Sequence, residues 1–279
     1  MRSGFITLVG RPNVGKSSLV NEMCGTKVSI VSDKPQTTRT RVRGVLTTDE
    51  AQLVFVDTPG LHKPVTALGE RVNATALDSV GDVDVVCLVI DATKPFGTGD
   101  QWVASHLDLP HAIVIVNKID AVKPEVVIDQ LAKASELGAA DYFPVSARTG
   151  KGIPELVAHL SSLVPEGPKF FPDDTVSDQP EEQWVAELVR EQLLAVTRDE
   201  LPYSIATRVT EWEWPRVRVE IIVERESQKG MVIGKGGSVL KEVGRRARLQ
   251  LPEGCFLELF VKVDKDWQRR PDRVERLGY

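Results

Sequence analysis

A segment near the N-terminus combines glycines, a lysine and serines at a spacing that could bind phosphate groups. It fits the pattern GxxxxGK[ST] between a strand-like and a helix-like run, and its residues are Gly10, Arg11, Pro12, Asn13, Val14, Gly15, Lys16, Ser17 and the following Ser18. Glycines let backbone N–H groups close around phosphate oxygens at the positive end of the next helix. Lys16 would neutralise the β- and γ-phosphates, and the Ser17 hydroxyl would bind Mg²⁺. The alternative, a glycine-rich turn that binds nothing, is disfavoured by the strand–helix context.

Two further segments could complete a site for magnesium and the γ-phosphate. Asp57 opens an Asp-x-x-Gly sequence that ends at Gly60, directly after a strand-like run. The Asp57 carboxylate could reach the magnesium shell through a water molecule, and the Gly60 N–H could sense a γ-phosphate. Thr38, in a Gln-Thr-Thr-Arg sequence before the second strand, would complete the magnesium sphere only when GTP is bound. An isolated Asp-x-x-Gly sequence is more often an ordinary turn, so the assignment of Asp57 and Gly60 rests on their position directly after this strand.

Two later segments could recognise the base. They follow the fifth and sixth expected strands, and their residues are Asn117, Lys118, Asp120, Ser146, Ala147 and Arg148. The Asp120 carboxylate can accept two hydrogen bonds, from guanine N1–H and from the 2-amino group. Adenine offers no matching donors and would leave a buried carboxylate unpaired, which is a penalty large enough to set specificity. The Ala147 backbone N–H would lie near guanine O6.

In this order, the segments resemble the five guanine-nucleotide motifs of the translation-factor-related GTPases. The resemblance covers Gly4 to about Val164. It implies that the chain binds GTP and GDP and hydrolyses GTP to GDP and phosphate with Mg²⁺. An ATPase has little support left in the sequence.

The residue that would position the attacking water is not evident. Ras-like GTPases carry a glutamine directly after Asp-x-x-Gly, and Leu61 stands there in this chain. The Gly-x-Pro-Asn-Val-Gly-Lys-Ser sequence resembles the Era/MnmE-like GTPases, in which an asparagine at the position of Asn13 can help hold potassium against the phosphates. We therefore expect slow intrinsic turnover that K⁺ stimulates. The alternative is that Asn13 only caps the loop.

The first part of the chain alternates strand-like with helix-like runs. Expected strands cover Phe5–Val9, Val42–Thr47, Gln52–Val56, Val83–Ile90, Ala112–Val116 and Tyr142–Val145. A hairpin at Thr48-Asp49 places one antiparallel strand at the edge of a mostly parallel sheet. This pattern predicts an α/β domain over residues 1–164, with the ligand at the carboxyl ends of the strands.

The pattern stops at residue 165. Residues 165–180 are rich in proline and aspartate and are predicted to be a linker. An amphipathic helix is expected over Glu181–Arg198, followed by strands near Ser204–Val209, Val217–Val223 and Phe256–Val263. Residues 181–279 are therefore predicted to form a second, α+β domain that includes a C-terminal tail.

A Gly-x-x-Gly sequence lies between two helical stretches of this second domain, which has the order α-β-β-α-α-β. The pattern resembles a type II KH domain over roughly Gln183–Trp267, and it implies contacts with RNA from Ile233, Gly234, Lys235, Gly236, Gly237, Lys241, Arg245 and Arg246. Side chains at the outer glycines would keep a nucleic-acid backbone from approaching the turn, and an apolar groove beside it would receive about four unpaired bases. The alternatives are a packing turn between two helices and, for the arginines, a solvated helix face.

The charged residues are distributed unevenly between the two predicted domains. The net charge is −5, but residues 181–279 hold 18 basic and 18 acidic side chains, so the first part carries the whole excess. Within the neutral part, residues 228–248 hold six basic residues and one acidic residue. This local excess favours nucleic acid although the global charge does not. No apolar run approaches the ~18 residues that a membrane span needs.

One such GTPase domain, a proline-rich linker and one KH domain is the arrangement of the Era family of ribosome assembly GTPases. This resemblance, end to end, implies binding to the 3′ end of 16S ribosomal RNA and to the 30S subunit during its maturation. It implies a bacterial cytoplasm, which three scattered cysteines and the missing leader also favour. Family members also associate peripherally with membranes. With no dimer signature visible, a monomer is expected.

Two other functions stay open from the sequence. The chain could be a membrane-associated signalling or cell-cycle GTPase in which RNA binding is secondary. It could also be a constitutive RNA-binding module whose nucleotide is structural. Co-fractionation with 30S particles or with membranes would separate the first alternative from an assembly role.

Overall fold

The computed structural model describes residues 1–61 and 66–279. The chain divides into two compact units. Of the described residues, the first unit holds 1–29, 38–61 and 71–178, and the second unit holds 30–37, 66–70 and 179–279. The predicted boundaries of the two domains and the linker remain predictions. Residues 165–178 pack within the first unit.

The first unit is built on a six-stranded sheet. Its strands are β1 (Arg2–Gly10), β2 (Val42–Thr47), β3 (Ala51–Asp57), β4 (Val85–Asp91), β5 (Ala112–Asn117) and β6 (Asp141–Pro144). The order is β2-β3-β1-β4-β5-β6, and only β2 runs antiparallel to its neighbour. The expected α/β fold with one antiparallel edge strand is confirmed.

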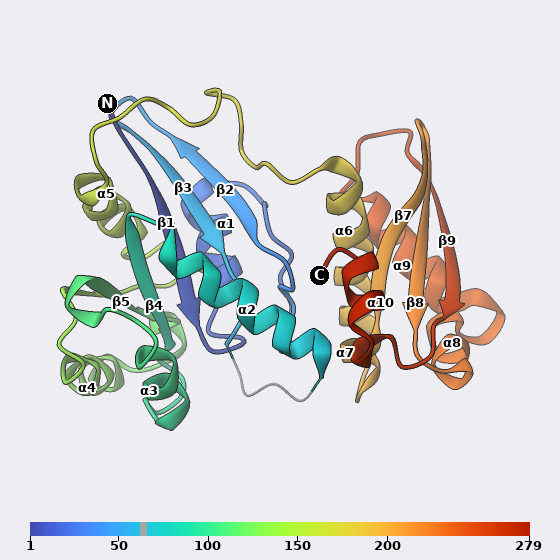
Figure 1. Cartoon of the computed structure of the whole chain (residues 1–279), viewed down its shortest axis with the longest axis horizontal. Coiled ribbons are helices and arrows are strands. Elements are labelled where there is room, and N and C mark those ends of the chain that lie inside the picture. The colour runs from blue at the N-terminus through green and yellow to red at the C-terminus, as the bar shows by residue number, and fades with distance from the viewer. Residues whose placement is uncertain (62–65) are drawn as a thin grey trace. The chain divides into compact units, whose positions relative to one another are not determined.

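Helices cover both faces of this sheet. They are α1 (Lys16–Cys24), α2 (Ala67–Gly81), α3 (Thr98–Ala104), α4 (Pro124–Ser135) and α5 (Ile153–Leu163). Figure 1 shows α2 in front of the sheet and α1 behind it. Alternate strand residues feed two apolar clusters: Ile6 packs with α1 and α5, and Val9 packs with α2, α3 and α4. Because both faces are buried, β3 and β5 are apolar throughout most of their length.

The second unit contains a smaller sheet of order β7-β8-β9. Its elements are α6 (Glu181–Val196), α7 (Leu201–Ser204), β7 (Ala206–Glu213), β8 (Arg216–Val223), α8 (Glu226–Ile233), α9 (Ser238–Arg248), β9 (Phe256–Val263) and α10 (Pro271–Arg276). Strand β8 pairs antiparallel with β7 and parallel with β9. Alternate residues of β8 are buried against α6, α8 and α9. The predicted α-β-β-α-α-β order is confirmed.

Two further features concern the lengths and ends of the helices. In the described part of the chain, no helix is long and apolar enough to cross a membrane. Helix α3 has only 7 residues, and α5 begins with an Ile-Pro pair after a glycine turn.

Candidate nucleotide site and nucleic-acid interface

The phosphate loop connects the end of β1 to the start of α1. Gly15 has φ +99°, and a Cβ atom there would lie 2.3 Å from Asn117 Nδ2, so only glycine fits this position. Lys16 is buried and directs its ammonium group back into the loop, where Nζ donates to the Gly10 carbonyl at 3.2 Å and to the Arg11 carbonyl at 3.1 Å. The loop is thus wrapped around its own cation, in the geometry that a polyphosphate requires.

Three oxygen-bearing side chains predicted for magnesium meet beside this loop. Ser17 Oγ donates to Asp57 Oδ2 at 2.7 Å and lies 2.9 Å from Thr38 Oγ1. Thr38 Oγ1 donates to the same Asp57 oxygen at 3.3 Å. Asp57 is fully buried, and among the residues that the structure describes its other oxygen, Oδ1, has no hydrogen-bond partner. Burial raises the pKa of Asp57, against the opposing effects of Ser17 and Lys16. A buried, unpaired carboxylate oxygen next to two hydroxyls fits Mg²⁺, which prefers hard oxygen ligands.

The segment after β3 packs on the phosphate loop. A Cβ atom on Gly60 would lie 2.7 Å from the Pro12 backbone, and the Leu61 N–H donates to the Gly10 carbonyl at 3.1 Å. Leu61 itself is 1 % exposed and belongs to the apolar cluster on the α2 face of the sheet. The residue that replaces the water-orienting glutamine is therefore a core residue.

The residues predicted for guanine recognition also meet in one place. Ser146 Oγ donates to Asp120 Oδ1 at 2.5 Å, and Arg148 Nε donates to Asp120 Oδ2 at 2.7 Å. The hydrogen bond from Ser146, together with Arg148, lowers the pKa of Asp120 and holds it as an acceptor. Asn117 links the two ends of the site, because it donates to the Val14 carbonyl at 2.9 Å and accepts from the Ala147 N–H at 3.1 Å.

Sequence reasoning missed Asp91 at the carboxyl end of β4. Lys118 Nζ lies 2.6 Å from Asp91 Oδ2 and 2.6 Å from the Asn13 carbonyl, so the lysine joins the base-binding segment to the phosphate loop. Burial opposes ionisation of Asp91, but Lys118 and Thr93 outweigh it and lower its pKa. The signal in the sequence that could have indicated Asp91 is its position at the carboxyl end of the strand before β5.

The Gly-x-x-Gly turn connects α8 to α9 in the second unit. Ile233 ends α8, and Gly234, Gly236 and Gly237 all have positive φ angles of 71°, 59° and 78°. A Cβ atom on Gly234 would lie 2.5 Å from the Val239 side chain, whereas Gly236 and Gly237 face open space. The first glycine is thus required by packing within the domain, and the other two leave an uncovered approach to the start of α9.

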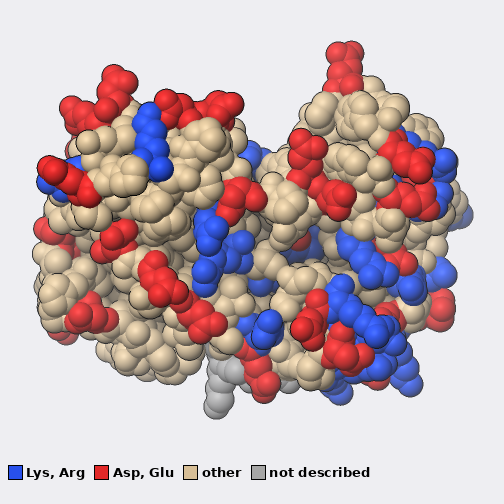
Figure 2. Space-filling view, turned by 45° about the horizontal axis from the view of Figure 1, so that its top comes forward, with Lys and Arg blue, Asp and Glu red and all other residues tan. Residues whose placement is uncertain are grey.

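The basic residues of α9 are partly neutralised by one carboxylate. Glu242 accepts from Arg245 Nε at 2.9 Å and from Arg246 Nε at 2.6 Å. These hydrogen bonds lower the pKa of Glu242 to about 2, and the one from Arg245 contributes most. Figure 2 shows basic and acidic side chains intermingled on the visible face of the second unit. Lys235 lies in the turn itself, and Lys241 follows it on α9.

The pKa of Lys16 should change when a nucleotide binds. Burial lowers its pKa to about 8, although Asp57 opposes the shift. In the free protein, Lys16 therefore loses its proton as the pH rises through 8, and phosphate groups should restore it. We expect uptake of about half a proton per GDP bound at pH 8, and weaker binding above that pH. Titration calorimetry in two buffers of different ionisation enthalpy measures the uptake.

The matched control is Lys16→Arg, which keeps a positive charge throughout this pH range. The difference in proton uptake between the wild-type protein and this variant isolates the contribution of Lys16. Equal uptake by the two proteins would contradict the assignment of a lowered pKa to Lys16.

The fold and the site define the chain as a P-loop GTPase that carries a KH domain. Residues 5–118 match the family model described as a 50S ribosome-binding GTPase, and residues 200–268 match the KH domain model. The chain is 44 % identical to GTPase Era of Heliobacterium modesticaldum over 100 % of this chain and 97 % of that protein. It is 46 % identical to GTPase Era of Mycobacterium tuberculosis, with 99 % and 98 % covered. The chain belongs to the Era family of GTPases.

Two solved structures of Era match the whole chain. One is Era in complex with MgGDPNP and nucleotides 1506–1542 of 16S ribosomal RNA, at 40 % identity and a TM-score of 0.94, with 100 % of this chain and 99 % of that chain covered. The other is a variant of Aquifex aeolicus Era bound to GDP·AlF4⁻, at 39 % identity and a TM-score of 0.95, with the same coverage.

Proposed function

We propose that this GTPase binds the 3′ region of 16S ribosomal RNA through its KH domain and assists assembly of the 30S subunit. The observation that carries the proposal is the likeness, over the whole chain, to Era in complex with MgGDPNP and nucleotides 1506–1542 of that RNA. The open turn at Gly236 and Gly237, with Lys235 inside it, supports the proposal because a nucleic-acid backbone can approach it closely. Helix α9 adds basic side chains at Lys241 and in its last turn.

Within the first unit, the phosphate loop and Lys16 hold the phosphates, and Ser17, Thr38 and Asp57 hold Mg²⁺, the last through a water molecule. Asn117, Lys118, Asp120, Ser146, Ala147 and Arg148 form the guanine site. The buried Asp57 Oδ1 and the paired carboxylate of Asp120 support these assignments. Bound Mg²⁺ supplies charge neutralisation for the phosphoryl group. The chain's own residues would hold the triphosphate in place.

RNA affinity is expected to depend on the nucleotide. By thermodynamic linkage, the factor by which GTP changes the affinity for RNA equals the factor by which RNA changes the affinity for GTP. We expect an RNA that copies the 3′ end of 16S ribosomal RNA to bind at least about fivefold more tightly with a GTP analogue than with GDP. Fluorescence anisotropy with both nucleotides measures this ratio, and an RNA of scrambled sequence is the control. Equal affinities would remove the switch from the proposal, and absent RNA binding would contradict the RNA-binding role itself.

We also propose that K⁺ assists hydrolysis beside Asn13, because Leu61 is buried in the core and supplies no group for the attacking water. Asn13 has φ +65°, a conformation that glycine also adopts readily. The Asn13→Gly variant should therefore keep the backbone conformation of the phosphate loop and lose the stimulation of GTP hydrolysis by K⁺. We expect hydrolysis by the wild-type protein to be several-fold faster in KCl than in NaCl, with about equal rates for the variant. Equal rates of the wild-type protein in the two salts would rule out this role of K⁺.

A further inference from the structure

The segment just before Thr38 belongs to the second unit. Residues 30–37 cluster with that unit, while Thr38 itself belongs to the first. Ile30 packs with Leu188 and Leu194 of α6, and the Val31 N–H donates to Glu191 Oε1 at 3.0 Å. One end of the segment is therefore fastened to helix α6 by apolar contact and a charge-assisted hydrogen bond.

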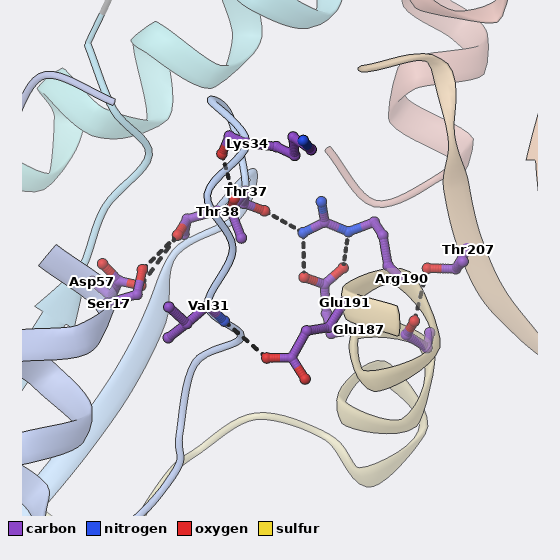
Figure 3. A network of polar contacts seen from close by, with 11 residues as sticks. Ser17, Val31, Lys34, Thr37, Thr38, Asp57, Glu187, Arg190, Glu191 and Thr207 are labelled. Carbon is purple, nitrogen blue, oxygen red and sulfur yellow. Dashed lines mark hydrogen bonds and ion pairs between the residues drawn. The ribbon is translucent and has the colours of Figure 1, made fainter. Parts of the chain in front are cut away.

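The other end of the segment is held by a buried arginine. Arg190 of α6 donates from Nη2 to the Thr37 carbonyl, as Figure 3 shows. The arginine side chain has 0 % exposure and is oriented by Glu187, which accepts from Nε at 2.8 Å and from Nη2 at 2.5 Å. Burial opposes the charge of Arg190, but Glu187 outweighs it and raises the pKa, so the guanidinium stays charged.

This arginine acts on the peptide that leads into the magnesium site. The Thr37 carbonyl and the Thr38 N–H belong to one rigid peptide plane, so a hydrogen bond that fixes the carbonyl also fixes the start of Thr38. The Thr38 hydroxyl lies 2.9 Å from Ser17 Oγ, next to the buried Asp57 carboxylate (Figure 3). The same helix is tied to the KH sheet, because Thr207 of β7 donates to the Ala186 carbonyl at 2.8 Å.

We propose that Arg190 is a positioning residue for Thr38, and that it couples the γ-phosphate to the RNA-binding unit through helix α6. Thr38 contributes to magnesium only in the GTP state, so a group that fixes Thr37 favours GTP over GDP. Conversely, when Thr38 moves on GTP hydrolysis, the Thr37 carbonyl moves with it and alters the hydrogen bond from Arg190 of α6. The inference rests on the proposed nucleotide site and deepens the proposed switch.

The variant must not leave a buried charge unpaired, because removing one partner of a buried ion pair is strongly destabilising. We therefore choose the double variant Glu187→Gln with Arg190→Met, which removes both charges and keeps most of the volume. A second variant, Arg190→Lys, keeps the charge against Glu187 but loses the planar fork that reaches Thr37. The control is Arg198→Met, which removes an exposed charge just beyond the end of α6.

Nucleotide affinities of the full chain, without RNA, test the inference independently of the RNA-binding role. We expect both Arg190 variants to bind a GTP analogue at least about tenfold more weakly, with GDP affinity within about twofold of wild type. The control should match wild type for both nucleotides. Thermal unfolding of the GDP-bound proteins checks that the fold is kept.

A second measurement follows the coupling. The ratio of RNA affinities with the GTP analogue and with GDP should fall to about one in the variants, while RNA affinity with GDP is kept. Unchanged preference for the GTP analogue would overturn the inference, as would an equal loss for both nucleotides, which would indicate only a structural role. If wild type binds no RNA, the proposed function fails, but the nucleotide test of Arg190 still decides this inference.

Discussion

The Asp120→Asn variant is expected to bind GDP about four orders of magnitude more weakly than the wild-type protein and to accept xanthosine diphosphate. The Asp120 carboxylate is fixed as a double acceptor by Ser146 and Arg148. An amide at this position presents a donor to the guanine 2-amino group, which is itself a donor. Xanthine carries a carbonyl oxygen at that position, so the same amide becomes complementary to it.

Competition titrations with GDP, ADP and xanthosine diphosphate measure this change of preference. The matched control is Asp129→Asn, an exposed carboxylate on α4 that pairs only with Lys133 in the described structure. The control should keep the wild-type order of affinities, and ADP should bind poorly to all three proteins. GDP affinity of Asp120→Asn within tenfold of wild type would show that another group recognises the base.

Replacing both Lys235 and Gly236 with aspartate is expected to weaken binding of the ribosomal RNA about a hundredfold at low salt. The change removes one cation and adds two anions in the turn that phosphates would approach. Gly236 has φ +59°, which aspartate tolerates, and a Cβ atom there meets nothing within 4 Å. Aspartate at Gly234 is a poorer test, because its Cβ would overlap Val239 and disturb the domain itself.

The control for this variant is the pair Lys265→Asp and Gly254→Asp, which makes the same change of charge at an exposed lysine and an open glycine of positive φ. RNA affinity measured between 50 and 200 mM salt should give a log–log slope shallower by about 0.7 if Lys235 contacts one phosphate. Equal losses in the two double variants would indicate a general effect of charge and would contradict a role for the turn.

That the residues proposed for the nucleotide site meet at one edge of the sheet was predictable, because they follow strands that could be recognised locally. The runs that became β3 and β5 are apolar and short, and the carboxyl ends of parallel strands meet at one edge of a sheet. The sequence alone therefore places Asp57 and Asn117 at the same edge of the sheet. The strand boundaries were correct to within a few residues, since apolar pattern and turn residues both change at those points.

The role of Arg190 could not be predicted from the sequence. The helical period places it off the apolar stripe of Val185, Val189 and Leu193, where a charged residue normally faces water. It is buried because residues 30–37, more than 150 positions earlier in the chain, cover a second face of α6. The local pattern indicates the main apolar face of a helix, but it cannot indicate that a distant segment packs against a second face and buries a charged residue there.

The path of residues 165–178 has a consequence for how the protein can be divided. These residues run beside the edge strand β2, where the Val45 N–H donates to the Val176 carbonyl at 3.0 Å and Ser177 bridges to Gly44. Arg43 also pairs with Asp178 at 2.8 Å. A fragment cut at Val164 would leave unpaired strand backbone open to self-association, because exposed edges template aggregation. An isolated nucleotide-binding fragment should therefore retain the chain through Asp178.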